Sequence, residues 1–303
     1  MTKKKIVYIV GGLGSQMSAY ALWISLRNKF KDVEYDLSWF DENPQCHQGS
    51  ELPKIFGIPD GRSSRWITYP LSQRLSRIPA RLVFKVLKFM GIIKWLSAER
   101  CKYDFDPTVF TDRYGVTIYY QCWTSYKYFI GVEDKIKAAF SFPPISFDFN
   151  EKFQRFKANR EVVAVHIRCG DSIMSPAFAG LTPIAYFREA TNLISAKIKS
   201  PIFLVFTDDL EWCRKNLDDK RLLFAKEIFP EIVESYQDMQ VMSMCDHNII
   251  SSSSFSWWAA YLNANPLKIV IAPEKWIRPD YGKINNISLS EMVMPGWITI
   301  KNI

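Results

Sequence analysis

Short apolar runs rich in β-branched residues alternate with helical patterns along most of the chain. The run Ile6–Val10 leads into a glycine turn and a helical pattern from Gln16 to about Phe30, and a second set begins at Val162–His166. The later segments of this kind are the helix Pro183–Ser200, the strand Ile202–Phe206, the helices Asp209–Asn216 and Met239–Met244, the strand His247–Ile250, the helix Phe255–Leu262 and the strand Ile269–Ala272. Because strands that alternate with helices form parallel sheets through crossover connections, the sequence predicts an α/β fold.

The length and the charge distribution suggest two domains of different character. The chain has 303 residues, and Phe142-Pro143-Pro144 lies near a plausible boundary, so we predict α/β domains at 1–150 and 151–303. The segment 62–102 has a net charge of +9, whereas the whole chain has +8. It is helical in pattern and has no clear strand, which predicts a basic helical insertion. The rest of the chain is close to neutral, and we expect no nucleic-acid partner.

The cysteines and the apolar segments indicate a cellular compartment. The six cysteines are scattered, with no Cys-x-x-Cys pair and no histidines at zinc spacing, which favours a reduced protein. Lysines 3–5 precede an apolar run of only five residues, too short for a signal peptide. No apolar stretch reaches the roughly 18 residues needed to span a bilayer. We therefore expect a cytoplasmic protein without a membrane span.

The glycine turn after the first strand is a candidate binding loop. Gly12 and Gly14 match the first two glycines of a dinucleotide-binding fingerprint, but Met17 stands in place of the third. A nicotinamide oxidoreductase is therefore disfavoured. A glycine loop that enters a helix still offers free N–H groups to a phosphate. The alternative is a turn with no ligand.

A second candidate site follows the strand that begins the C-terminal half. His166, Arg168 and Asp171 lie where this strand ends, and ligands of open parallel sheets bind at the carboxyl ends of strands. A guanidinium can hold a diphosphate through two parallel hydrogen bonds. The alternative for Arg168 is a surface ion pair with Asp171.

Four consecutive serines form the third candidate site. They occupy 251–254, after an apolar run and directly before a helical pattern that begins near Phe255. Hydroxyl groups and unpaired N–H groups at a helix N-terminus bind anions. The alternative is a helix cap, which is common for one serine and less so for four.

Taken together, these motifs resemble the α-1,2-fucosyltransferases of glycosyltransferase family eleven. The matching segments are Gly11–Met17, His166–Asp171, Phe206–Cys213 and His247–Trp258, in the order of the family. Three positions depart from its pattern: Ser15 replaces the usual asparagine, Cys169 replaces a second arginine, and Ser172 stands where an aromatic residue often follows. We expect the loss at position 169 to weaken donor binding.

The resemblance implies a fold, a reaction and a set of residues. The fold would be of the GT-B type, with two Rossmann-like domains facing across a cleft. The enzyme would move L-fucose from GDP-β-L-fucose to O2 of a β-galactoside with inversion, for bacterial surface polysaccharide. The catalytic residues would be Arg168 and Asp171, with Glu51 as a second candidate base. The donor-binding residues would be Gly12, Gly14, Ser15, Gln16, His166, Arg168, Asp238, Ser253, Ser254 and Phe255. The alternative is a glycan- or nucleotide-binding module without activity.

Two further expectations concern the guanine base and metal ions. Asp238 matches the aspartate that similar enzymes use on the guanine edge, and its alternative role is to cap the helix Met239–Met244. Asp104-Phe105-Asp106 resembles a metal-binding Asp-x-Asp, but it follows the basic helical region rather than a strand. We expect no metal site and no cofactor, with GDP-fucose as a co-substrate and an organic clamp on its diphosphate.

The basic segment offers a possible membrane contact. A helical pattern from Pro79 to Trp95 places Arg81, Lys85 and Lys88 on one face, beside a broad apolar surface. The apolar residues are Leu82, Phe84, Leu87, Phe89, Ile92, Ile93 and Trp95. Such a helix suits peripheral binding to an anionic membrane, where a lipid-linked acceptor would be met. The alternative is a helix packed on the domain core with a solvated basic rim.

Overall fold

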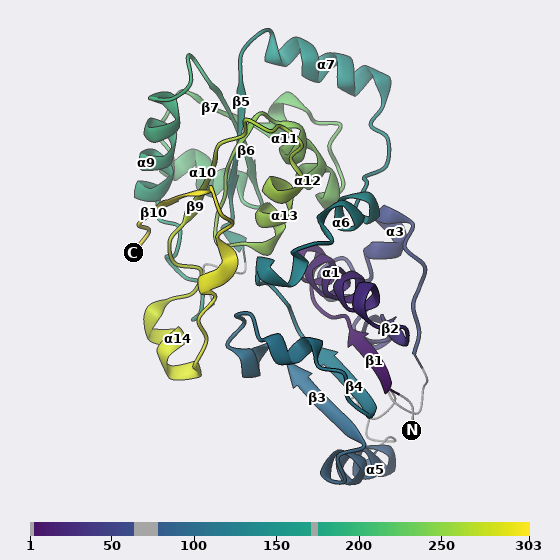
Figure 1. Ribbon diagram of the computed structural model, residues 1–303. Helices are drawn as coiled ribbons and strands as arrows, with labels where there is room; N and C mark the ends of the chain where they lie inside the picture. The colour runs from purple at the N-terminus through teal and green to yellow at the C-terminus, as the bar shows by residue number, and fades with distance from the viewer. Residues whose placement is uncertain (1–2, 64–77, 171–174) are drawn as a thin grey trace. The chain divides into compact units, whose positions relative to one another are not determined.

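The protein was analysed as a computed structural model that describes residues 3–63, 78–170 and 175–303 (Figure 1). The chain forms two compact units, Met1–Ser141 and Phe142–Ile303. Helix α7 (Phe147–Lys157) spans residue 150, where the domain boundary was predicted, and lies in the second unit. It is held there because Phe149 and Phe153 pack on Phe229, with ring centroids 5.2 and 5.8 Å away.

The first unit is built on a four-stranded parallel sheet. The strand order is β2 (Val33–Asp36), β1 (Lys3–Tyr8), β4 (Gly115–Tyr120) and β3 (Ile93–Ser97). Helix α1 (Leu13–Lys29) buries twelve of its residues. The other helical elements are α2 (Trp39–Glu42), α3 (Leu52–Phe56), α5 (Ile78–Phe89), η3 (Ala98–Cys101), η4 (Pro107–Phe110), η5 (Tyr126–Phe129) and α6 (Glu133–Ala139).

The basic segment 62–102 is only partly helical. Helix α5 ends at Phe89, and Gly91 adopts a φ of +72° that few other residues tolerate. The amide of Gly91 bonds to the carbonyl of Lys88, and the amide of Ile92 bonds to that of Leu87, which is a Schellman ending. Strand β3 follows at once and pairs with β4. The prediction that this segment holds no strand was therefore wrong.

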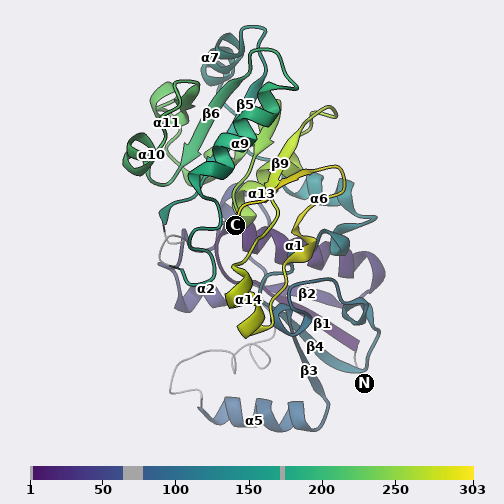
Figure 2. The same ribbon diagram turned by 90° about the vertical axis from the view of Figure 1, so that its left-hand side faces the viewer.

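The second unit contains a six-stranded parallel sheet with helices on both faces. The order is β10 (Ile298–Ile300), β9 (Val270–Pro273), β8 (His247–Ile249), β5 (Val162–Ile167), β6 (Ile202–Thr207) and β7 (Leu222–Phe224). Figure 1 shows α9 (Ile184–Ser195) and α13 (Ser254–Leu262) on opposite sides of this sheet, and Figure 2 views α9 in front of it. The remaining helices are α10 (Leu210–Asn216), α11 (Ala225–Ile228), α12 (Ser235–Met244), α14 (Pro279–Asn285) and η6 (Ser290–Met292).

The α/β fold class predicted from the sequence is confirmed. All five predicted strands are present as β1, β5, β6, β8 and β9, each within three residues of its expected bounds, and both sheets are parallel throughout. Strands β2, β3, β4, β7 and β10 were not predicted. The placement of the two domains across a cleft stays a prediction.

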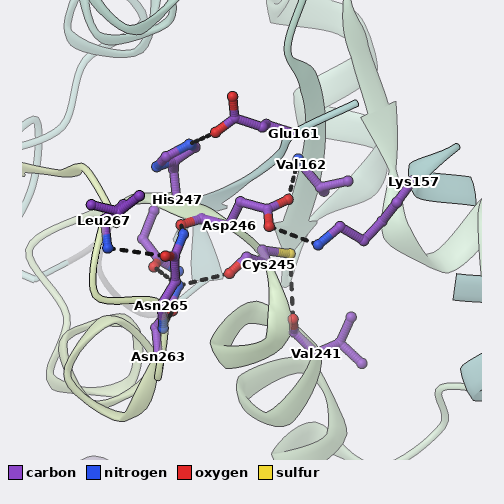
Figure 3. Close-up of polar contacts among 11 residues, drawn as sticks. Lys157, Glu161, Val162, Val241, Cys245, Asp246, His247, Asn263, Asn265 and Leu267 are labelled. Carbon is purple, nitrogen blue, oxygen red and sulfur yellow. Dashed lines mark hydrogen bonds and ion pairs between the residues drawn. The ribbon is translucent and has the colours of Figure 1, made fainter. Parts of the chain in front are cut away.

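A polar network fixes the amino ends of β5 and β8 (Figure 3). Asp246 accepts hydrogen bonds from Lys157 Nζ at 2.7 Å and from the amide of Val162 at 2.8 Å. His247 Nδ1 accepts from the amide of Ile269 at 2.9 Å, so the ring proton lies on Nε2, which is 2.6 Å from Glu161 Oε2. His247 belongs to a motif of the sequence analysis, yet its contacts are structural.

Candidate functional site

The parallel pairing of β5 with β8 brings two of the sequence motifs together. Val165 lies opposite Ile249, so the residues that follow each strand meet at the same edge of the sheet. His166 Nδ1 lies 2.7 Å from Ser251 Oγ, and Arg168 Nη1 donates to Ser253 Oγ at 3.2 Å. This edge therefore combines a fixed guanidinium with the serine loop.

His166 is a neutral, buried part of this edge. Only 8% of its surface is exposed, and burial together with the charge of Arg168 lowers its pKa to about 3. Its ring lies 5.7 Å from that of Phe255, between centroids. The positive charge at this edge is consequently that of Arg168 and not that of His166.

The N-terminus of α13 adds a second attraction for anions. Ser253 is the N-cap: its hydroxyl accepts from the amide of Phe255 at 3.3 Å while it also accepts from Arg168. The helix starts at Ser254 and has no acidic residue in its first turn. No carboxylate of this first turn offsets the partial positive charge of the helix N-terminus, which lies beside the guanidinium of Arg168.

A pocket of about 340 Å³ opens at this edge of the second unit. Arg168, Ser251 and Ser252 line it, together with apolar surface from Trp212 and Phe178. Ser251 belongs to the serine loop of the sequence analysis but was not among the residues named as donor-binding, and Trp212 was not selected at all. Both nevertheless follow the carboxyl ends of strands, β8 and β6, which is the signal that could have identified them.

Cys169, which replaces an arginine of the family pattern, faces the protein interior. Its side chain is 2% exposed within the core cluster, and a hydrogen bond with Cys213 and burial raise the pKa of its thiol. Its amide donates to Asp208 Oδ1 at 2.7 Å. Gly170 follows under steric constraint, because a Cβ there would lie 2.6 Å from Asp208 Oδ2. Asp208 thereby fixes the backbone directly after Arg168, a role that the sequence did not reveal.

Asp238 carries an unsatisfied carboxylate oxygen. Helix α12 is capped by Glu234, which forms a reciprocal capping box with Gln237, so the capping role considered for Asp238 is excluded. Its Oδ1 is buried and has no hydrogen-bond partner among the described residues. Burial raises the pKa of Asp238 to about 6, with Lys226 acting in the opposite direction. A buried acceptor of this kind is costly unless water or a ligand supplies donors.

The glycine loop belongs to the first unit and is organised by Gln16. Gly11 has a φ of +85°, and Gly12 is the N-cap of α1. The fully buried amide of Gln16 donates to the carbonyls of Gly11 and Gly49 at 2.9 Å each and accepts from the amide of Glu51 at 2.9 Å. Gln16 therefore ties the glycine loop to the segment 49–51.

The same loop leaves little free space around its glycines. A Cβ at Gly12 would lie 3.2 Å from the ring of His47, so that ring covers the entrance to α1. Gly14 is buried in the first turn of α1, whereas Ser15 stays partly exposed. Direct donor contacts of Gly12, Gly14 and Ser15 stay predictions.

The predicted catalytic residue Asp171 lies outside the described residues.

The Asp104-Phe105-Asp106 segment has a structural role. Asp106 caps η4 by accepting from the amide of Thr108 at 2.8 Å, and Asp104 lies in the loop before it. Within residues 3–63, 78–170 and 175–303, no group of three or more potential metal ligands occurs. None of the helices in those ranges has the length and hydrophobicity required to cross a membrane.

Comparison with known proteins identifies the family. The model of glycosyl transferase family 11 matches residues 98–301. The chain belongs to this family. It is therefore a glycosyltransferase, as the motifs predicted, and the matched region includes β5, β8 and the serine loop.

Individual relatives agree with this membership. An α-1,2-colitosyltransferase of Escherichia coli is 26% identical and is aligned over 89% of this chain and 91% of its own length. The O-antigen biosynthesis glycosyltransferase WbnK of Escherichia coli is 32% identical over 47% of this chain and 45% of its own. Galactoside α-(1,2)-fucosyltransferase 1 of Leontocebus fuscicollis is 33% identical over 34% of this chain and 29% of its own.

Solved structures of fucosyltransferases are also similar at low identity. NodZ from Bradyrhizobium is 15% identical, with a TM-score of 0.43, over 85% of this chain and 93% of its own. A mutant of Arabidopsis thaliana FUT1 in complex with GDP is 11% identical, with a TM-score of 0.48, over 92% of this chain and 73% of its own.

Proposed function

We propose that this glycosyltransferase moves L-fucose from GDP-β-L-fucose to O2 of a β-galactoside with inversion. The observation that carries the proposal is the pairing of Arg168 with Ser253 at the N-terminus of α13. A guanidinium and a helix N-terminus side by side suit the two phosphates of a nucleoside diphosphate. The relatives named as α-1,2-transferases support the linkage.

The same groups would assist departure of the nucleotide. As the bond from fucose C1 to the phosphate oxygen breaks, negative charge grows on GDP, and Arg168 with the first turn of α13 would stabilise it. The guanidinium is positioned for this role, because Ser253 at the N-terminus of α13 accepts a hydrogen bond from it. The sugar would gain oxocarbenium character and be attacked from its opposite face.

The buried carboxylate of Asp238 would select guanine. Guanine presents N1–H and a 2-amino group as neighbouring donors, and the unsatisfied Oδ1 of Asp238 is an acceptor in need of one. Adenine lacks this pair of donors. Helix α12, which carries Asp238, packs against α13, so both proposed contacts come from adjoining elements.

On the acceptor side we propose Asp171 as the base that removes the galactose O2 proton, with Glu51 as the second candidate. Glu51 is 4% exposed, and its amide is fixed by Gln16. An oxocarbenium-like reaction needs modest help from a base, so we expect a smaller effect from Glu51→Gln than from Arg168→Ala.

Transfer from GDP-fucose to lactose tests the proposal. We expect a product whose mass is increased by one fucosyl residue and whose linkage is α-1,2, as judged by linkage-specific fucosidase digestion. Binding of GDP without any transferred fucose would instead identify a binding module that has kept the fold. Absence of both would refute the proposed donor.

A second candidate function is transfer of colitose, which is L-fucose without its 3-hydroxyl group. It is favoured by the colitosyltransferase relative, which is aligned over 89% of the chain. Nucleotide-activated colitose and GDP-fucose compared in parallel would separate the two. A higher kcat/KM with the colitosyl donor would correct the sugar while leaving the proposed nucleotide contacts in place.

We further propose that the enzyme needs no metal ion and no cofactor, and that it works in the cytoplasm in the synthesis of bacterial surface polysaccharide. The role of Arg168 and the α13 N-terminus as an organic clamp supports the first point. The O-antigen biosynthesis relative supports the second. A lipid-linked acceptor would then bring the protein into peripheral contact with the inner face of the membrane.

A further inference from the structure

Helix α5 is apolar on two faces. Its inner face packs on the sheet of the first unit through Phe84 and Leu87, and Phe84 meets Trp95 edge-to-face at 6.1 Å between ring centroids. Ile93 and Trp95, which the sequence analysis assigned to the helix, belong to β3. The packed-helix alternative is therefore correct for this face, and it leaves the outer face to be explained.

The outer face exposes large apolar side chains that nothing covers among the described residues. Their exposed fractions are 58% for Leu82, 58% for Val83, 55% for Val86, 93% for Phe89 and 63% for Met90. Their spacing places all five within roughly one third of the helix circumference. We call these residues the apolar ridge. Contiguous exposure of this kind marks an interaction surface, whereas isolated exposed residues are ordinary.

A basic pocket begins at the end of this ridge. It has a volume of about 560 Å³ and is lined by Lys88, Lys94, Arg100 and Arg113, with Trp95, Tyr114 and Asp112. Asp112, the one acid, is already engaged, because it lies 2.6 Å from Lys3 Nζ and 3.6 Å from Lys5 Nζ.

Among the described residues, the cations that line the pocket form no close ion pair. No ion pair is formed by Lys88, Lys94 or Arg113 within the described ranges of the chain. Burial and the charges of Arg113 and Arg100 lower the pKa of Lys94, and the carboxylate of Asp106 opposes this only in part. Arg113 and Arg100 thus repel Lys94, and an anion in the pocket would relieve this repulsion.

We propose that the apolar ridge and the basic pocket together form a docking site for an anionic phospholipid membrane, with the pocket holding a phosphate headgroup. The ridge would enter the boundary between headgroups and acyl chains, next to the pocket, since Lys88 lines the pocket and Phe89 follows it. This inference names the residues that would make the peripheral membrane contact proposed above, and it rests on that proposal.

Charge complementarity selects a membrane over a second copy of the chain. A symmetric pairing through this surface would bring four cations of one copy toward the same four of the other, with Asp112 already paired. A phospholipid surface instead supplies apolar volume for the ridge and phosphate for the pocket at a single boundary. Both halves of the site are then satisfied by one partner.

Sedimentation of the full chain with lipid vesicles tests the site. Vesicles of phosphatidylcholine alone are compared with vesicles containing half phosphatidylglycerol. We expect binding only to the anionic vesicles. The double variant Lys94→Gln/Arg113→Gln should lower the partition coefficient about 25-fold, since each cation near an anionic surface contributes roughly a factor of five. The double variant Val86→Ser/Phe89→Ser should lower it at least tenfold, because apolar surface is lost from the boundary.

Matched variants control for general loss of charge or apolar surface. Lys283→Gln/Lys301→Gln removes two exposed cations from the second unit, and Val233→Ser/Ile284→Ser removes apolar residues that are 80% and 82% exposed there. Both should bind vesicles as the wild type does. All four variants should keep the wild-type melting temperature and the wild-type rate of transfer to lactose in solution.

The outcomes separate this site from the proposals on which it rests. Wild-type protein that ignores both kinds of vesicle would refute the membrane contact, whereas binding that neither site variant reduces would refute the site alone. Equal binding to uncharged vesicles would overturn the headgroup pocket. A concentration-dependent dimer that Val86→Ser/Phe89→Ser abolishes would assign the ridge to a second copy. Failure to transfer fucose in solution would refute the catalytic proposal and leave the vesicle result intact.

Discussion

Asp238 offers a test that joins folding stability to nucleotide recognition. Replacement by asparagine keeps the size of the side chain and removes its charge. The pKa of Asp238 rises from an ordinary 3.8 to about 6 in the folded protein because of burial. Between these two pH values the unfolded chain releases the proton first, so the free energy of unfolding falls as the pH rises through this window.

The size of the effect follows from the two pKa values. A tenfold change in proton affinity is worth about 1.36 kcal/mol, which gives roughly 3 kcal/mol for the full difference. Asp238 keeps part of its surface in water, so we reduce the expected cost of its charge to about 2 kcal/mol at pH 8. Asp238→Asn should therefore stabilise the ligand-free protein at pH 8 relative to wild type, and this advantage should vanish near pH 4.

Urea unfolding at several pH values between 4 and 8 measures this difference. Asp148→Asn is the matched control, because Asp148 is exposed in the first turn of α7 in the same unit. The control should show no such gain with rising pH. A difference between wild type and Asp238→Asn that stays constant across the range would refute the view that Asp238 is a buried carboxylate without a partner.

Calorimetric binding of GDP supplies the functional half of the test. The carboxylate accepts hydrogen bonds best when ionised, so wild-type affinity for GDP should increase as the pH rises past about 6. Asp238→Asn should bind GDP at least tenfold more weakly at pH 8 and lose this pH dependence. Unchanged affinity in the variant would place guanine elsewhere.

Three other predictions concern the remaining groups of the candidate site. Arg168→Ala should reduce transferase activity by several kcal/mol of transition-state stabilisation with an unchanged melting temperature, whereas Arg155→Ala, at an exposed position, should not; activity within a few-fold of wild type would contradict the clamp. EDTA should leave the rate of transfer within about twofold, and a loss that Mn²⁺ restores would return Asp104 and Asp106 to consideration. The pKa of His166 is lowered to about 3 from 6.5, so its contribution to stability is complete above pH 6.5 and is lost as the pH falls. In the wild type, this should cost about 2 to 3 kcal/mol of the free energy of unfolding between pH 7 and 4.5, and His166→Gln should remove that loss, as measured by urea midpoints. An identical pH profile in the variant would show that His166 is accessible to protons.

The sequence predicted the central strands better than the edges of the sheets. Strands β5 and β6 are buried along their whole length and read as continuous apolar runs. Strand β2 has the sequence Val-Glu-Tyr-Asp, and β7 has three residues, so neither carries a pattern long enough to separate it from a loop. Their pairing depends on neighbours that are distant in the sequence.

The sequence contains a signal for the end of α5, but the basic and apolar composition around it favoured a longer helix. Gly91 marks the stop of the helix, as glycine often does at this position. Basic and apolar residues continue on both sides of it, which made a single longer helix plausible. The exposed ridge was consequently assigned partly to residues that face the core.

The site was predictable where motifs follow strands and unpredictable where contacts cross the fold. Arg168 and Ser253 follow paired strands, and their meeting could be expected from parallel topology. The hydrogen bond from the amide of Cys169 to Asp208 joins the loops after β5 and β6, and no sequence pattern at either residue predicts it. The unsatisfied oxygen of Asp238 requires knowledge of which residue caps α12.

The network at the amino end of β8 has a consequence for the exchange of parts between related enzymes. His247 and Ser251 belong to one motif, but His247 is held by Glu161 and Ile269, whereas Ser251 bonds to His166 at the opposite end of the strand. With about 3.3 Å per residue, these two ends lie on the order of 13 Å apart. A graft of the motif alone would bring the serine loop into a host that lacks the contacts holding His247. The piece that can be exchanged between enzymes is the strand pair β5 and β8 with its flanking residues. We expect chimeras that take β5 from one parent and β8 from the other to be impaired in folding, not only in catalysis.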